Sequence, residues 1–267
     1  MTSIALGGRV AVVIGGGGIG GACARTLGGA GARVAVIDRD GEAADALALS
    51  IGGHGYAADC ADEVALGTVH AAIEARLGPV EMLINASAVF HSLIPAATFP
   101  MKKWDEVMRV NQRGVFTSCR MFGTSMTKRG GGAIVNIASV AGMRSFPLHA
   151  YAAAKAAVIA MSANLAVEWG PSGVRVNALS PGFTRTPAVQ AVIDSGASPD
   201  QLMLAGTPLG RLVEPDEVAL AALFLLSPAA SAITGINLPV DCGWLAGSSW
   251  QAYGGPGALH PADLVPQ

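Results

Sequence analysis

The chain has 267 residues and a net charge of −2, with 51% hydrophobic and only 13% charged residues. This length predicts one α/β domain, and the lack of a basic excess argues against nucleic acid or an anionic membrane surface as a partner. So few charges on so apolar a chain favour subunit contacts that cover part of its surface.

The four cysteines are far apart, and neither CxxC spacing nor a Cys/His cluster indicates a metal site. Scattered single thiols are typical of a reducing cytosol, so we expect a cytoplasmic protein. The first residues show no signal-peptide pattern. Residues 218–240 carry no charge and are long enough to span a bilayer, but their prolines, glycine and asparagine predict a buried helix, a turn and a strand instead.

The chain opens with a strand, a glycine-rich turn, a helix and a second strand that ends in an acid. The strands are expected at residues 10–14 and 34–37, with the glycines at 15–21 and the helix at 22–30. This order is the dinucleotide-binding arrangement, in which glycines let the backbone approach a pyrophosphate and a helix N-terminus offers N–H groups to it.

Asp38 lies 18 residues after Gly20, where a carboxylate accepts hydrogen bonds from the adenosine ribose hydroxyls. Such a carboxylate repels a 2′-phosphate, so it favours NAD over NADP, although Arg39 partly offsets the repulsion. In the alternative interpretation, Asp38 only caps the next helix.

Strands and helices alternate through the rest of the chain. We expect helices at 42–51, 62–77, within 104–126, at 152–169 and at 215–226, and strands at 54–58, 80–84, 132–138, 174–179 and 236–240. The alternation predicts a doubly wound, Rossmann-type parallel sheet with helices on both faces, in a single domain over residues 1–247. Residues 187–206 show no clean period and are expected to form a substrate lid, and residues 248–267 a C-terminal tail.

Ser139, Tyr151 and Lys155 follow the apolar strand at 132–138, with the tyrosine and lysine on the next helix. The i, i+4 spacing places the phenol and the ammonium on one helix face, about 5–6 Å apart at Cβ. A neighbouring ammonium favours tyrosinate, and proton transfer near neutrality needs a tyrosine pKa lower by about 2–3, worth about 3–4 kcal/mol. By chance, about one such chain in twenty would contain a Tyr-x-x-x-Lys pair, so the other motifs must decide its meaning.

With these motifs in order, residues 7–247 resemble the short-chain dehydrogenase/reductase family, in its single-domain form of about 250 residues. The resemblance implies a sheet of about seven strands and a homotetramer or dimer. The glycine loop is one residue shorter than the family's usual loop, and Cys242 stands where a glycine is usual. The landmarks that carry the likeness are the glycine loop, Asp38, Asp59, Asn85 to Ala88, Asn111, Ser139, Tyr151, Lys155, Asn177 to Gly182 and Thr186.

The resemblance also implies roles for individual residues. Tyr151 would be the general acid/base, Lys155 would lower its pKa, Ser139 would position the substrate oxygen, and Asn111 would hold a water of a proton relay. Substrate contacts are expected from His91, Ser139, Arg144, Tyr151 and Phe183. Cofactor contacts are expected from Gly15, Gly17, Gly18, Ile19, Gly20, Asp38, Arg39, Asp59, Cys60, Asn85, Ala86, Tyr151, Lys155, Pro181, Gly182, Thr184 and Thr186.

The expected activity is the NAD-dependent interconversion of a secondary alcohol, or a sugar or polyol hydroxyl, with a ketone. Two alternatives stay open: an NAD-binding sensor or regulatory protein without turnover, and a dehydratase or isomerase on the same scaffold. The shortened glycine loop is the feature that favours the sensor. NADP is the less favoured cofactor, and no metal is expected.

Overall fold

The computed structural model describes residues 4–196, 203–204 and 206–256. Within them, the centre is a seven-stranded parallel sheet with strand order β3-β2-β1-β4-β5-β6-β7. This confirms the predicted doubly wound, single-domain architecture. The strands are β1 (Val10–Ile14), β2 (Arg33–Asp38), β3 (His54–Ala57), β4 (Val80–Asn85), β5 (Gly132–Ile137), β6 (Val174–Pro181) and β7 (Asn237–Val240).

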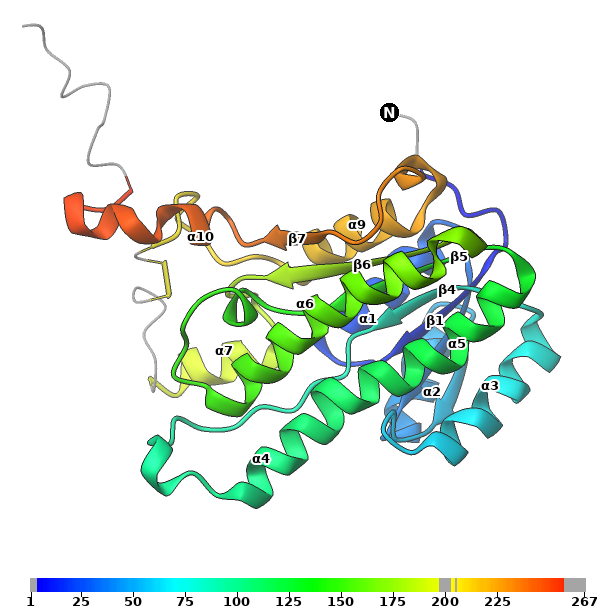
Figure 1. Cartoon of the computed structure of the whole chain (residues 1–267), viewed down its shortest axis with the longest axis horizontal. Coiled ribbons are helices and arrows are strands. Elements are labelled where there is room, and N and C mark those ends of the chain that lie inside the picture. The colour runs from blue at the N-terminus through cyan, green and yellow to red at the C-terminus, as the bar shows by residue number, and fades with distance from the viewer. Residues whose placement is uncertain (1–3, 197–202, 205, 257–267) are drawn as a thin grey trace, which may run out of the picture.

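Helices cover both faces of this sheet (Figure 1). One face carries α1 (Gly18–Gly29), α2 (Gly41–Ser50) and α9 (Pro215–Leu226), and the other carries α3 (Glu63–Leu77), α5 (Val115–Arg129) and α6 (His149–Trp169). Every residue of β1 is buried, because a central parallel strand is covered on both sides. The two layers of apolar contacts therefore hold the sheet rigidly between them.

Further helices lie toward the C-terminal edge of the sheet. The arrowheads of β6 and β7 point to the left of Figure 1, where α7 (Pro187–Asp194) and α10 (Trp244–Gly247) lie. Short 3₁₀ helices are η1 (Ala96–Thr98), η3 (Val140–Gly142), η4 (Gly170–Ser172), η5 (Pro228–Ala230) and η6 (Ser248–Tyr253).

Local sequence signals explain where several helices begin. The Asp40 carboxylate accepts from the Ala43 N–H at 3.1 Å and caps α2, and Asp62 caps α3 in the same way. Glu214 and Glu217 form a reciprocal capping box at the start of α9. These caps satisfy N–H groups that the first turn of a helix leaves without partners.

Three elements differ from the sequence-based expectation. Helix α1 begins at Gly18 rather than at residue 22, so the last glycines of the loop form its first turn. The long helix expected within 104–126 is α4 (Met101–Met108) and α5 joined by a π-helical stretch, η2 (Arg109–Gly114). The expected lid begins with a regular helix, α7, while residues 197–202 and 205 lie outside the described residues.

Helix α6 is unusually apolar. By length and composition alone, residues 149–172 would also suffice to cross a membrane. In the structure, α6 packs over β6 and η3 and supplies Val158 and Leu165 to the apolar core. We therefore interpret α6 as a core helix of the domain.

Candidate active site

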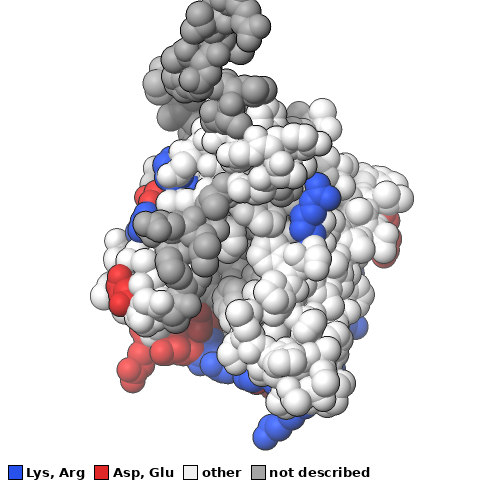
Figure 2. Space-filling view, turned by 90° about the vertical axis from the view of Figure 1, so that its left-hand side faces the viewer, with Lys and Arg blue, Asp and Glu red and all other residues white. Residues whose placement is uncertain are grey.

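The sequence-predicted site residues gather at the C-terminal edge of the sheet, where ligands bind in open α/β folds. Figure 2 looks onto this edge, and most of the surface in view belongs to uncharged residues. Many of them come from the ends of β1, β4, β5 and β6, which the parallel pairing brings side by side. The others come from β2, from the segment after β3, and from η2 and α6.

Ser139 stands two residues after the last residue of β5 and directly before η3. Its hydroxyl oxygen accepts from the Ala141 N–H at 3.1 Å, which sets the position of the serine side chain. The Ser139 side chain is also near enough to the Tyr151 phenol, on the first turn of α6, to act on its pKa. The segment between them therefore brings the two hydroxyl-bearing side chains close together.

Lys155 lies one turn after Tyr151 on α6, and both side chains are buried. The lysine Nζ donates to the Ile137 carbonyl oxygen at 2.6 Å and lies 5.6 Å from the centroid of the Tyr151 ring. Tyr151 is 6% exposed and Lys155 is 1% exposed. The structure thus assembles the predicted Ser-Tyr-Lys group.

The electrostatics of this group differ from the expectation. Burial raises the pKa of Tyr151 to about 12, although the neighbouring Ser139 side chain acts to lower it. Burial also lowers the pKa of Lys155 to about 8. Burial of the phenol therefore outweighs the opposing effect of its neighbours on the tyrosine pKa. That Lys155 lowers this pKa stays a prediction.

Asn111 lies in the π-helical stretch η2 and is fully buried. Its side chain accepts from the Val89 N–H at 2.8 Å and donates to the Val89 carbonyl oxygen at 2.9 Å. Asn111 therefore fixes the backbone after β4. Single π-helical turns within longer helices are frequent at functional sites. This one contacts the segment after β4 at Val89.

The glycine loop packs against two other segments of the site. A side chain at Gly15, whose φ is +94°, would place its Cβ 2.6 Å from the Ser87 nitrogen after β4. A Cβ at Gly18 would lie 3.1 Å from the Thr186 methyl group after β6. A Cβ at Gly20 would collide with the Gly15 carbonyl oxygen. These close approaches explain why small residues occupy the loop.

Gly17 is the exception within the loop. Among the described residues, no atom lies within 4 Å of the position that its Cβ would take, and its φ of −80° suits any residue. Gly17 precedes α1 and, having no side chain, leaves the first N–H groups of the helix available to a ligand. This donor set fits the pyrophosphate of a dinucleotide.

Asp38 ends β2 beside the glycine loop. Its carboxylate accepts from the Gly16 N–H at 2.7 Å and from the Asp40 N–H at 3.1 Å. The caps described above show that Asp40, and not Asp38, caps α2. The alternative in which Asp38 merely caps this helix is therefore wrong, and Asp38 connects the loop to the sheet edge instead.

Asp59 and Cys60 follow β3 and contact the start of η2. Asp59 pairs with Arg109 at 2.8 Å, and this hydrogen bond holds the carboxyl pKa below its usual range against the opposing effect of partial burial. Cys60 is buried, and a Cβ at Gly114 would lie 2.5 Å from its sulfur atom. The exposed Arg39 lies near enough to Asp59 to act on it electrostatically.

Asn85 has its side chain committed to a buried network rather than directed at the open edge. Its amide donates to the Asn136 oxygen at 2.7 Å, and its own oxygen accepts from the Ser118 hydroxyl at 2.6 Å. Asn136 in turn donates to Ser162 at 2.9 Å, which links β4 and β5 to α5 and α6. The methyl group of Ala86 approaches the glycine loop, where a Cβ at Gly20 would lie 3.0 Å from it.

The segment after β6 lies against the glycine loop. Thr184 donates to the Gly182 carbonyl oxygen at 3.0 Å and pairs through its backbone with Val213. Gly182 follows Pro181 and lies so close to Asp241 that a Cβ there would be 2.9 Å from the Asp241 Cα. Thr186 caps α7 and stands over Gly18.

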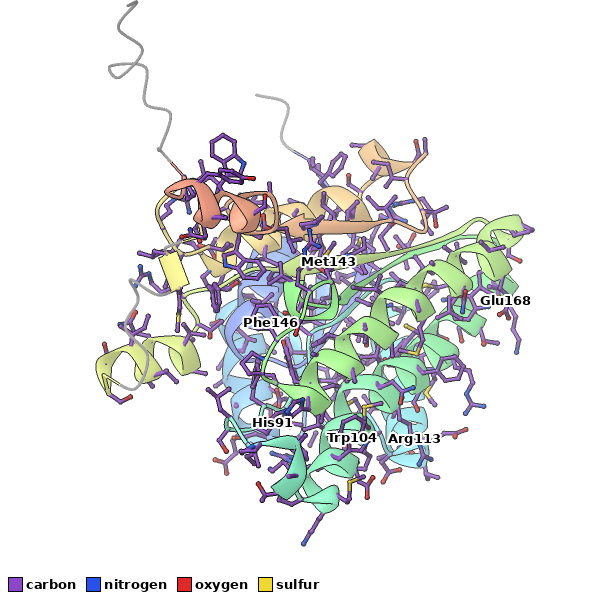
Figure 3. The ribbon with its side chains drawn as sticks, turned by 60° about the vertical axis from the view of Figure 1, so that its left-hand side comes forward. His91, Trp104, Arg113, Met143, Phe146 and Glu168 are labelled. Carbon is purple, nitrogen blue, oxygen red and sulfur yellow. The ribbon has the colours of Figure 1, made fainter. Side chains whose placement is uncertain are left out.

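The expected substrate residues are distributed unequally. His91 is buried against α6, whereas Arg144 is exposed on the loop before α6. Phe183 joins an aromatic cluster with Phe146 and Trp244, whose ring centroids are 5.3–6.2 Å apart. Figure 3 shows Met143 and Phe146 on the segment between β5 and α6, and His91, which belongs to the segment after β4, lower in the view.

The sequence motifs gave no indication of three contacts at this edge: Arg109 with Asp59, Ser87 with Gly15, and Phe146 with Trp244. Arg109 lies two residues before Asn111, on the helix expected there. A basic residue so close to a predicted site residue was the one sequence feature that could have indicated its pairing with Asp59. The other contacts join residues from separate loops, and a local pattern does not show such pairs.

Comparison with known proteins agrees with this geometry. The family model described as enoyl-(acyl carrier protein) reductase matches residues 14–245. The chain is 40% identical to the D-threitol dehydrogenase of Mycolicibacterium smegmatis, over 90% of this chain and 94% of that protein. It is 40% identical to the galactitol 2-dehydrogenase (L-tagatose-forming) of Cereibacter sphaeroides, over 91% and 97% respectively.

Solved structures agree as well. A protein named ribose-5-phosphate isomerase from Brucella melitensis 16M superposes with a TM-score of 0.92 at 45% identity, covering 95% of this chain and 99% of that one. A structure from Agrobacterium tumefaciens with bound NADP gives a TM-score of 0.82 at 32% identity, over 92% and 100%. Because the family model and these relatives match nearly the whole domain, the chain belongs to the short-chain dehydrogenase/reductase family of oxidoreductases.

Proposed function

We propose that the protein is an NAD-dependent dehydrogenase that interconverts a secondary alcohol and a ketone, with a polyol or sugar hydroxyl as the substrate. The observation that carries this proposal is the buried Tyr151 phenol with Lys155 one turn further on and Ser139 as its neighbour, at the same sheet edge as the glycine loop. The similarity to D-threitol and galactitol dehydrogenases supports the polyol class.

The chain's own residues supply proton transfer and positioning. Ser139 holds the substrate oxygen next to the phenol, and in the oxidative direction the Tyr151 phenolate takes the hydroxyl proton while the C–H bond breaks. In the reductive direction the phenol returns that proton to the carbonyl oxygen. Lys155 places a cation beside the phenol, and Asn111 holds the neighbouring backbone at Val89. A bound nicotinamide would supply the site that accepts or donates the hydride.

The cofactor preference rests on Asp38. Its carboxylate lies at the end of β2, next to the loop that fits the pyrophosphate, so a negative charge stands where NADP would bring its 2′-phosphate. This favours NAD, although two structural relatives are solved with bound NADP. Arg39 is the neighbouring cation that would weaken the preference.

The first test is NADH formation from a panel of polyols and simple secondary alcohols, including threitol and galactitol. We expect turnover with at least one polyol, and we expect Tyr151→Phe to lower turnover by about three orders of magnitude while NADH still binds, because general acid/base catalysis contributes about 10²–10⁴-fold. A Tyr151→Phe variant with nearly normal turnover would show that the acid/base role is wrong.

The same panel distinguishes the alternatives. The Brucella relative is named an isomerase. An isomerase would convert a sugar with no net change in NADH absorbance. A sensor would bind NADH saturably and turn over none of the alcohols. Either outcome would contradict the dehydrogenase proposal.

A further inference from the structure

The segment directly after β4 contacts Tyr151 at its ring. The Phe90 ring stacks on the Tyr151 ring with centroids 4.6 Å apart and planes 24° apart. Phe90 is 58% exposed, whereas Tyr151 is 6% exposed. Phe90 therefore stands between the phenol ring and solvent, with one side on the tyrosine and much of the rest in water.

His91 contacts the backbone of the same tyrosine. Its Nε2 accepts from the Tyr151 N–H at 3.4 Å, and its Nδ1 lies 2.7 Å from the Ser92 carbonyl oxygen. A neutral ring with its proton on Nδ1 satisfies both contacts, because one nitrogen then donates and the other accepts. His91 is 8% exposed, and its ring meets the Phe99 ring edge-on with centroids 4.8 Å apart.

Helix α6 gains a cap from this contact. Its N-cap residue, Leu148, has no side-chain hydrogen-bonding group, and the Tyr151 N–H is one of the first-turn donors that have no partner within the helix. His91 supplies that partner from a different element. The catalytic helix is thereby connected to the end of β4 at the position of Tyr151 itself.

The contacting segment is anchored at its other end. Both backbone groups of Val89 are hydrogen-bonded by the Asn111 side chain, at 2.8 and 2.9 Å. Residues 89–91 thus bridge η2 and the first turn of α6, with one anchor at each end. A segment held in this way can fix both the height and the tilt of the phenol ring.

We propose that Phe90 and His91 are positioning residues that hold the Tyr151 phenol for proton transfer, His91 through the tyrosine N–H and Phe90 through its ring. The inference rests on the proposed acid/base role of Tyr151. Other polar or titratable groups near the tyrosine are Ser139 at the end of β5 and Lys155 on α6, and His149 of α6 lies across the Phe99 ring.

The test of His91 uses two matched variants. His91→Phe keeps an aromatic ring against Phe99 but has no acceptor, whereas His91→Gln keeps an acceptor oxygen at the end of a side chain of similar reach. We expect His91→Phe to lower kcat about tenfold with an unchanged KM for NAD, and His91→Gln to recover kcat to within about threefold of wild type. Equal kcat values for wild type and His91→Phe, or an equal loss in both variants, would overturn the role of the acceptor.

The test of Phe90 uses the pH dependence of alcohol oxidation. Phe90→Ala admits water to the Tyr151 phenol, and this lowers the pKa of the phenol. The rising limb of the kcat/KM profile should therefore shift to lower pH by about half a pH unit or more. Leu49→Ala, which removes an 82% exposed side chain on α2, is the matched control and should leave the profile unchanged. A Phe90→Ala profile that coincides with wild type would contradict the covering role.

Tyr151→Phe, measured in parallel, separates the two proposals. An active Tyr151→Phe variant would remove the acid/base role itself. An inactive Tyr151→Phe variant, together with normal His91→Phe and Phe90→Ala variants, would refute the positioning role alone. NADH binding and thermal melting of each variant show that the fold is intact, and the exposed Phe90 gives a variant that is expected to fold even if His91→Phe does not.

Discussion

Tyr151 is held between opposing electrostatic effects. Burial raises its pKa to about 12, while the neighbouring Ser139 side chain acts to lower it. In this structure burial dominates, so the phenol carries its proton at neutral pH. A protonated phenol is the form that donates to a ketone, whereas alcohol oxidation needs the phenolate.

This balance predicts opposite pH dependences for the two directions. Below its pKa, the phenolate fraction of Tyr151 grows about tenfold for each pH unit, so alcohol oxidation should accelerate from pH 7 to about pH 9 and ketone reduction should not. Because the pKa of Lys155 is lowered to about 8 by burial, its charge declines above that pH and flattens the rise. Initial rates in both directions across this range check the prediction, and an oxidation rate that falls between pH 7 and pH 9 would contradict it.

Asp38 gives a second prediction at the scale of a single residue. Asp38→Ala removes the negative charge beside the glycine loop, so the preference for NAD over NADP, measured as the ratio of kcat/KM values, should narrow about tenfold or more. Asp40→Ala is the matched control, because it removes the cap of α2 two residues away and should leave the ratio unchanged. An unchanged ratio in Asp38→Ala would mean that this carboxylate does not discriminate the two cofactors.

At the scale of elements, the glycine loop and α1 form one unit, and its glycine positions differ in whether they have room for a side chain. Gly15 and Gly20 lie against other atoms of the protein, while Gly17 opens onto free space among the described residues. Steric reasons within the fold account for the first two glycines. They do not account for Gly17, and a ligand that approaches the loop would.

Gly17→Ala tests this distinction. The added methyl group meets no described protein atom, so the free energy of unfolding should stay within about 0.5 kcal/mol of wild type, while NADH affinity should fall about tenfold or more. Gly29→Ala, at the far end of the same helix and equally unobstructed, should change neither quantity substantially. A fluorescence titration with NADH and a denaturant melt of both variants measure the two effects, and normal affinity in Gly17→Ala would argue against a pyrophosphate at this position.

The turn after β7 contains a strained residue. Cys242 has a φ of +52°, the left-handed region that costs a side-chain-bearing residue about 1–2 kcal/mol. Cys242→Gly should therefore stabilise the protein by up to about 1 kcal/mol, after the greater flexibility of glycine in the unfolded chain is included. The corresponding rise in Tm is about 2 °C. Cys242→Ala keeps the strain and should give no such rise, so equal Tm values for the two variants would show that strain is not the cause.

At the scale of the whole molecule, the parallel sheet converts distant sequence positions into one edge. The ends of β1, β4, β5 and β6 carry the glycine loop, Ser87, Ser139 and Thr186, and adjacent pairing places them together. Exposed apolar side chains remain on helices that lie away from this edge, such as Val167 on α6 and Leu220 on α9. A homo-oligomer and a cytoplasmic location stay predictions.

Much of the architecture could be predicted because strands and helices leave local patterns. Apolar β-branched runs marked the strands, and the order of glycines, acid and Tyr-x-x-x-Lys marked the site. The π-helical stretch η2 and helix α7 could not be predicted in this way. A π-helical turn depends on side-chain contacts such as that of Asn111 with Val89, and α7 begins at a Thr186 cap within a segment of irregular composition.

The sequence by itself determined the alternation of elements, the family and the identity of the Ser-Tyr-Lys group, because each is written in residue types at fixed spacings. Only the tertiary structure decided that burial dominates the pKa of Tyr151, that Asn85 joins an internal network, and that Phe90 and His91 contact Tyr151. The physical reason is that desolvation and contact between loops depend on what lies next to a residue in space, and neighbouring strands of this sheet come from positions far apart in the chain.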